Sequence, residues 1–139
     1  MSDQAYIEQT ASRPFRARPN EFDVTGRICV SSASDVRDAV QGIFQQAFPG
    51  GAFDILWMAF HDFERLFRGH YEDYLGCDTV YHDIQHTLDM TLAMARLLAG
   101  HEKTCAPADR LGQDRAMLGL ITALFHDAGY IRRRSETAI

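Results

Sequence analysis

Apolar residues recur at the three- and four-residue spacing of an α-helix through most of the chain. We predict a first helix from about Ser34, as its N-cap, to about Phe48, where the run Pro49-Gly50-Gly51 ends it. A second helix is predicted from about Asp54 to Phe67. Its apolar stripe should face the core and consists of Leu56, Phe60, Phe63 and Phe67.

Two further helices are predicted in the second half of the chain. One spans about residues 82–100 and carries an apolar stripe made of Ile84, Leu88, Leu92, Ala95 and Leu98. Pro107 opens the next helical region, in which the run 117–125 is too apolar for a surface helix and too short to cross a membrane. We therefore predict a buried helix that ends near Asp127, with Gly129 as its C-cap.

The N-terminal part of the chain shows no such periodicity. Residues 1–31 are predicted to be irregular, because the prolines at positions 14 and 19 interrupt any helix. Residues 24–30 are apolar enough for a short strand, but nothing nearby would pair with it. We divide the chain into an irregular segment, 1–31, and a helical domain, 32–139.

Composition agrees with an all-α fold, because Leu, Ala, Met and Phe outnumber Val, Ile and Thr in the apolar stretches. A chain of 139 residues that is 46% hydrophobic can form one domain with a core. The net charge of −5 argues against a nucleic-acid duplex as partner. Three cysteines without a pairing pattern, no signal peptide and no 18-residue apolar span indicate a cytoplasmic protein that does not enter a membrane.

Five residues in the later helical part of the chain suggest a metal site. On a helix that begins at residue 82, the side chains of His82, His86 and Asp89 would share one face. The pair His126-Asp127 closes the apolar run forty residues after His86, at a helix end where both side chains can converge on one ion. Imidazole and carboxylate ligands together favour Fe, Mn, Co, Ni or Zn over Ca, and Mg is a further candidate ion.

Three other histidines are predicted to have no part in this site. His61 lies off the buried stripe of its helix, although it also precedes an aspartate. His70 and His101 flank loops and are predicted to be exposed to solvent.

The pattern Tyr-His-x-x-x-His-Thr-x-Asp, followed by an apolar helix and His-Asp-x-Gly, resembles the HD superfamily of metal-dependent phosphohydrolases over roughly residues 80–131. The resemblance implies an HD-domain-like helical bundle in which His86, His126 and Asp127 are metal ligands. It implies that His82 is a proton donor or contacts the phosphate. We interpret Asp89 as a carboxylate that holds an imidazole in its correct tautomer.

The family's last ligand is an Asp several helices after the His-Asp pair, and no Asp follows Asp127 here. The sequence therefore predicts a bundle that is incomplete at its C-terminal end. The run Leu118–Phe125 would lack the later helices that cover it, so we predict a homodimer or a domain completed by a further segment of the protein.

Three function classes follow from these patterns. The first is a metal-dependent phosphohydrolase that uses metal-activated water on a phosphoester, with a nucleotide or a related small molecule as the expected substrate. The alternative is a non-catalytic, metal- or nucleotide-binding regulatory HD-like module. The third is a structural helical interaction domain.

Overall fold

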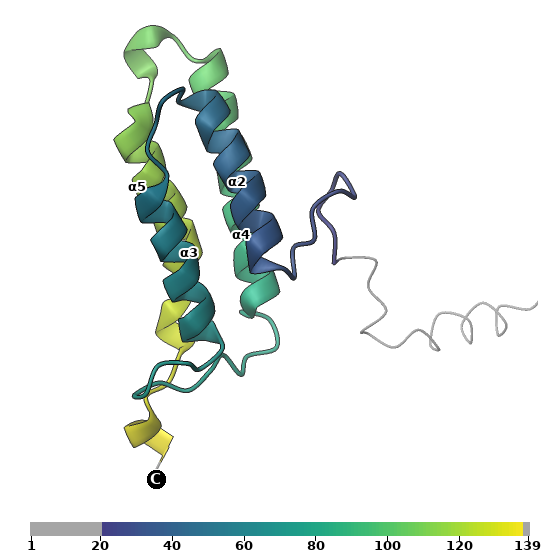
Figure 1. Cartoon of the computed structure of the whole chain (residues 1–139), viewed down its shortest axis with the longest axis vertical. Coiled ribbons are helices and arrows are strands. Elements are labelled where there is room, and N and C mark those ends of the chain that lie inside the picture. The colour runs from purple at the N-terminus through teal and green to yellow at the C-terminus, as the bar shows by residue number, and fades with distance from the viewer. Residues whose placement is uncertain (1–20, 138–139) are drawn as a thin grey trace, which may run out of the picture.

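The computed structural model of the chain describes residues 21–137, and these residues form the all-α fold that the sequence predicts. The α-helices are α2 (Ala33–Ala47), α3 (Asp54–Phe67), α4 (Ile84–Thr104) and α5 (Gly112–Phe125). A short 3₁₀ turn at Pro107–Asp109 lies between α4 and α5, and two more follow α5 at Ala128–Tyr130 and Arg134–Thr137. In Figure 1, α2 lies beside α4 and α3 lies beside α5, so the helices form a two-layer bundle.

Residues 24–30, which are apolar enough for a short strand, do not form one. Within residues 21–137 the segment 24–30 makes only an isolated antiparallel bridge between Phe22 and Cys29. Residues 1–20 of the predicted irregular segment lie outside the described residues, so that part of the prediction stays untested. None of the described helices is both long enough and apolar enough to cross a membrane.

Side-chain caps set the first residues of α2 and α4, and both differ from the predicted starts. The Ser32 hydroxyl accepts a backbone amide hydrogen bond at 3.3 Å, so α2 begins at residue 33 and the predicted N-cap Ser34 lies inside it. The Asp83 carboxylate accepts the His86 amide at 2.8 Å and caps α4. His82 therefore precedes the helix, and the prediction that it shares a helical face with His86 is wrong.

The end of α5 also differs from the prediction. The helix ends at Phe125, two residues before the expected end near Asp127, and a 3₁₀ turn follows at Ala128–Tyr130. Gly129 does not act as a left-handed C-cap, because it is absent from the described glycines with positive φ. His126 keeps helical backbone angles, with φ −60° and ψ −29°, whereas Asp127 departs from them, with φ −101° and ψ 7°. The side chains of His126 and Asp127 are therefore not held about 100° apart, as consecutive residues of a regular helix are.

The predicted core stripes are confirmed. All four stripe residues of α3 are buried, as are Leu88, Leu92 and Ala95 of α4, while Ile84 and Leu98 are partly buried against the core. The rings of Phe63 and Phe125 meet edge to face with centroids 6.3 Å apart, which joins α3 to the end of α5.

The apolar run in α5 is covered better than the sequence led us to expect. Leu120, Ala123 and Leu124 are buried, and Phe125 packs against the core from a partly buried position. Only Leu118 of the large apolar residues in this run is strongly exposed, at 64%. The preceding helices α3 and α4 cover this run. The homodimer prediction was based on an uncovered apolar surface there, so it loses that support and stays a prediction.

A buried carboxylate fastens the segment before α2 to α4. Asp23 is 6% exposed; it pairs with Arg96 of α4 and accepts hydrogen bonds from the Thr25 hydroxyl and from the amides of Arg27 and Ile28. Burial opposes ionisation of this carboxyl. The hydrogen bonds, led by those from Ile28 and Arg96, outweigh burial and hold the pKa of Asp23 well below its usual value.

Because the folded-state pKa of Asp23 is lowered, its stabilising contribution is present above the unfolded-state pKa of about 3.9 and is lost as the pH falls below it. We expect Asp23→Asn to lower the thermal midpoint at pH 7, and the gap from wild type to shrink progressively below about pH 4. Calorimetry between pH 2 and 7 measures this. Asp38→Asn, which removes an exposed carboxylate paired with Arg37, is the control and should leave the midpoint nearly unchanged. A pH-independent effect of Asp23→Asn would contradict the assignment.

Candidate metal centre

The predicted site residues meet because α4 and α5 are antiparallel neighbours. The two helices are joined at one end of the bundle by residues 105–111, so the first turn of α4 lies beside the last turn of α5 at the opposite end (Figure 1). Gly119 of α5 faces Leu98 of α4, although a Cβ atom at that position would make only an ordinary contact, 3.4 Å from Leu98 Cδ1. Residues about forty positions apart in the chain thereby share one site.

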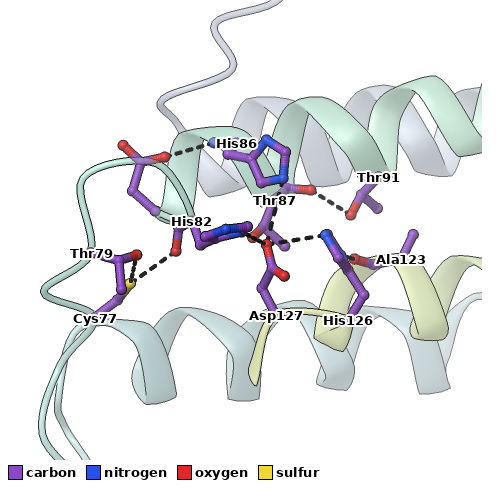
Figure 2. A network of polar contacts seen from close by, with 10 residues as sticks. Cys77, Thr79, His82, His86, Thr87, Thr91, Ala123, His126 and Asp127 are labelled. Atoms are coloured by element: carbon purple, nitrogen blue, oxygen red, sulfur yellow. Dashed lines mark hydrogen bonds and ion pairs between the residues drawn. The ribbon is translucent and has the colours of Figure 1, made fainter. Parts of the chain in front are cut away.

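Three imidazoles surround one oxygen of the Asp127 carboxylate, as Figure 2 shows. Oδ2 of Asp127 lies 2.8 Å from His82 Nδ1, 3.1 Å from His126 Nε2 and 3.5 Å from His86 Nε2. The carboxylate is 8% exposed, whereas the imidazole side chains are 24–33% exposed. A buried carboxylate is stable only when positive charge or hydrogen-bond donors surround it, and the three rings are placed to supply either.

The backbone hydrogen bond of His126 leaves its other ring nitrogen facing the Asp127 carboxylate. His126 Nδ1 lies 2.6 Å from the carbonyl oxygen of Ala123 and must donate its hydrogen there, because a carbonyl can only accept. In a neutral imidazole the lone pair is then on Nε2, which faces a carboxylate oxygen at 3.1 Å. Two acceptors at this distance repel unless a proton or a metal ion lies at the nitrogen.

The ligand distances fit a small divalent ion. Ligands about 2.0–2.2 Å from a tetrahedral ion lie about 3.4 Å from one another. The distance from Asp127 Oδ2 to His86 Nε2, 3.5 Å, is close to that value, while those to His126 and His82 are shorter and of hydrogen-bond length. Within the described residues, His82, His86 and Asp127 form a cluster whose ligand atoms all lie within 4.8 Å of one another. Nitrogen ligands with one carboxylate are a donor set of Zn, Fe, Mn, Co or Ni.

His82 is held in the site although it is not part of a helix. The Cys77 thiol donates a hydrogen bond to the His82 carbonyl at 3.0 Å, and the Cys77 amide donates to Phe67 at the end of α3. Tyr130 stacks on the imidazole with ring centroids 4.3 Å apart and planes 13° apart. Close packing of the loop depends on Gly69, where a Cβ atom would lie 2.6 Å from the nitrogen of Gly76.

The structure therefore brings together four of the five predicted site residues. Asp89 does not join them: its side chain is exposed and forms no hydrogen bond with the imidazoles of the described residues. Since α4 begins after His82, the face on which we placed Asp89 does not include that histidine. His61, His70 and His101 are exposed, as predicted.

Tyr130 and Thr87 are two residues of the site that sequence reasoning missed. Tyr130 follows Asp127 by three positions. An aromatic residue so close to the His-Asp pair could have indicated a ring that stacks on an imidazole. Thr87 follows His86 directly, and its hydroxyl is the one buried side-chain polar atom of the described residues that lacks a hydrogen-bond partner. An unsatisfied buried hydroxyl costs about 1–3 kcal/mol.

Comparisons with protein-family models, with curated proteins and with solved structures found no match to this chain.

The geometry predicts that the protein binds a divalent transition metal and that binding depends on Asp127 and His86. We expect Asp127→Asn and His86→Ala each to weaken Co²⁺ binding by more than about tenfold, because loss of a partner of a ligand alone commonly has an effect of that size. Isothermal titration calorimetry and cobalt absorption measure the affinity. His61→Ala, in the exposed His61-Asp62 pair of α3, is the matched control and should bind as wild type does. Equal affinity of all variants would rule out this site.

Proposed function

We propose that the chain is a metal-dependent phosphohydrolase with an HD-domain-like helical bundle. The observation that carries the proposal is the convergence of three imidazole nitrogens on one buried carboxylate oxygen at the paired ends of α4 and α5. The resemblance of residues 80–131 to the HD superfamily supports the same chemistry from the residue pattern alone. A cytoplasmic location accompanies the proposal, supported by free thiols at Cys29, Cys77 and Cys105.

The distances suggest a division of roles among the four residues. His86 and Asp127 are ligands in both the sequence pattern and the cluster geometry. His82 belongs to the same cluster as His86 and Asp127, so we propose it as a ligand rather than as the proton donor that the pattern implied. His126, with Nδ1 committed to the Ala123 carbonyl, presents Nε2 either to the ion or to a substrate oxygen.

A divalent ion held there would polarise a phosphoryl oxygen and lower the pKa of a coordinated water. The protein supplies the remaining requirements. The Asp127 carboxylate and the three rings define the position of the reacting group, and the partial exposure of the rings leaves a side open to a small phosphoester. Tyr130 fixes the plane of His82, which restricts the direction in which Nδ1 points.

Hydrolysis of a generic phosphoester by the metal-loaded full-length protein tests the proposal. We expect turnover of p-nitrophenyl phosphate or its bis ester with added Mn²⁺ or Co²⁺, and loss of that turnover in Asp127→Asn. Removing the ion with a chelator should abolish activity, and adding it back should restore it. His61→Ala should retain full activity.

A protein that binds metal at this site but hydrolyses none of a broad panel of phosphoesters would contradict the enzymatic proposal and favour the regulatory HD-like module. A protein that binds no transition metal would contradict both and leave the structural interaction domain.

A second measurement distinguishes a ligand role of His82 from a proton-donor role. We expect His82→Ala to lower metal content and turnover together, since its Nδ1 lies within the ligand cluster. Plasma mass spectrometry gives the metal content and steady-state kinetics give the rate. If His82→Ala keeps its metal and loses only turnover, the proton-donor role implied by the resemblance is correct instead.

A further inference from the structure

Thr87 is fully buried, and its hydroxyl forms no hydrogen bond with the helix backbone. The residue is 0% exposed, and Oγ1 has no hydrogen-bond partner among the described residues. It follows His86 in the first turns of α4, and in Figure 2 its side chain points from that helix toward the Asp127 carboxylate. A buried hydroxyl at such a place indicates a partner that the polypeptide alone does not provide.

Other helical threonines show that the orientation of Thr87 is not the usual one. In the described helices Thr91, Thr104 and Thr122 each donate the hydroxyl hydrogen to the carbonyl four residues earlier, at 2.8 Å in every case. Thr87 could make the same bond to the carbonyl of Asp83 but does not. A bond to the carbonyl four residues earlier is a common way for a helical threonine to satisfy its hydroxyl. The other threonines make this bond, and Thr87 does not.

One oxygen of the Asp127 carboxylate accepts no hydrogen bond from the described residues. Every hydrogen bond and ion pair of its side chain to residues 21–137 uses Oδ2, and Oδ1 accepts none. An ion bound between Oδ2 and the imidazoles would fix the plane of the carboxylate. Oδ1 would then need a donor, because partners of this kind orient a ligating carboxylate and tune its affinity.

We propose that Thr87 is a positioning residue of the metal centre, whose hydroxyl donates a hydrogen bond to Oδ1 of Asp127 when the ion is bound. The inference rests on the metal centre of the proposed function, but not on hydrolysis. It explains why the hydroxyl is turned away from the helix backbone: its partner is the ligand set in the occupied state.

Thr87→Val and Thr87→Ser test the assignment in the full-length protein, with Thr91→Val as the matched control. Thr91 is equally buried one turn later on α4, but its hydroxyl already bonds to the Thr87 carbonyl. We expect Thr87→Val to weaken Co²⁺ and Zn²⁺ binding about tenfold or more and Thr87→Ser to restore most of the affinity. In the metal-free protein, Thr87→Val should melt no lower than wild type, because valine has nearly the same shape and removes an unsatisfied group.

Thr91→Val should behave in the opposite way, with a lower melting temperature of the metal-free protein and unchanged metal affinity. The proposal is overturned if Thr87→Val binds Co²⁺ as tightly as wild type, or if it lowers the metal-free melting temperature as much as Thr91→Val does. A wild-type protein that binds neither metal would overturn it as well.

Failure of the proposed hydrolysis remains distinguishable from failure of this inference. A protein without turnover in which Thr87→Val still weakens metal binding keeps the Thr87 assignment and loses the enzymatic one. A protein with turnover in which Thr87→Val has wild-type affinity does the reverse.

Discussion

The arrangement of the candidate site depends on one buried carboxylate at the end of α5. Asp127 is 8% exposed and lies where the last turn of α5 meets the first turn of α4, so its charge must be neutralised by groups from both. Three imidazoles converge on a single oxygen of that carboxylate. Antiparallel packing of the two helices makes this possible, because it places the start of one beside the end of the other.

The site combines one residue on a helix with residues that lie beyond helix ends. His86 is fixed in the first turn of α4, whose start is set by the Asp83 cap. His82 and Asp127 both lie outside regular helix, and their positions depend on contacts from other parts of the chain, such as the Cys77 thiol and the Tyr130 ring. A residue outside a helix can adjust more readily when an ion binds, whereas His86 supplies a rigid reference.

The polar groups around the site differ in whether they have a hydrogen-bond partner. The His126 ring is fixed by the Ala123 carbonyl, and the Asp83 carboxylate is used by the His86 amide. The Thr87 hydroxyl alone among buried side-chain polar atoms of the described residues has no partner. Buried polar networks stabilise a protein when every member is satisfied, so a single unsatisfied hydroxyl beside a cluster of imidazoles sets this end of the bundle apart from the purely apolar core.

The sequence by itself determined the helical class, the buried stripes of α3 and α4, and the candidate residues of the site, of which His82, His86 and Asp127 form a group that could hold a metal ion. These features follow from periodicity and residue chemistry, which are local properties. Only the tertiary structure decided that His82 precedes α4, that Asp89 is exposed, that Gly129 does not cap α5 and that the buried Thr87 hydroxyl has no hydrogen-bond partner among the described residues. Because α4 begins at Ile84 and not at residue 82, His82 lies outside the helix and the helical spacing no longer relates it to His86; the Asp83 cap sets that start. The meeting of His82 with Asp127 across 45 residues depends on how α4 and α5 pack, which no local pattern specifies.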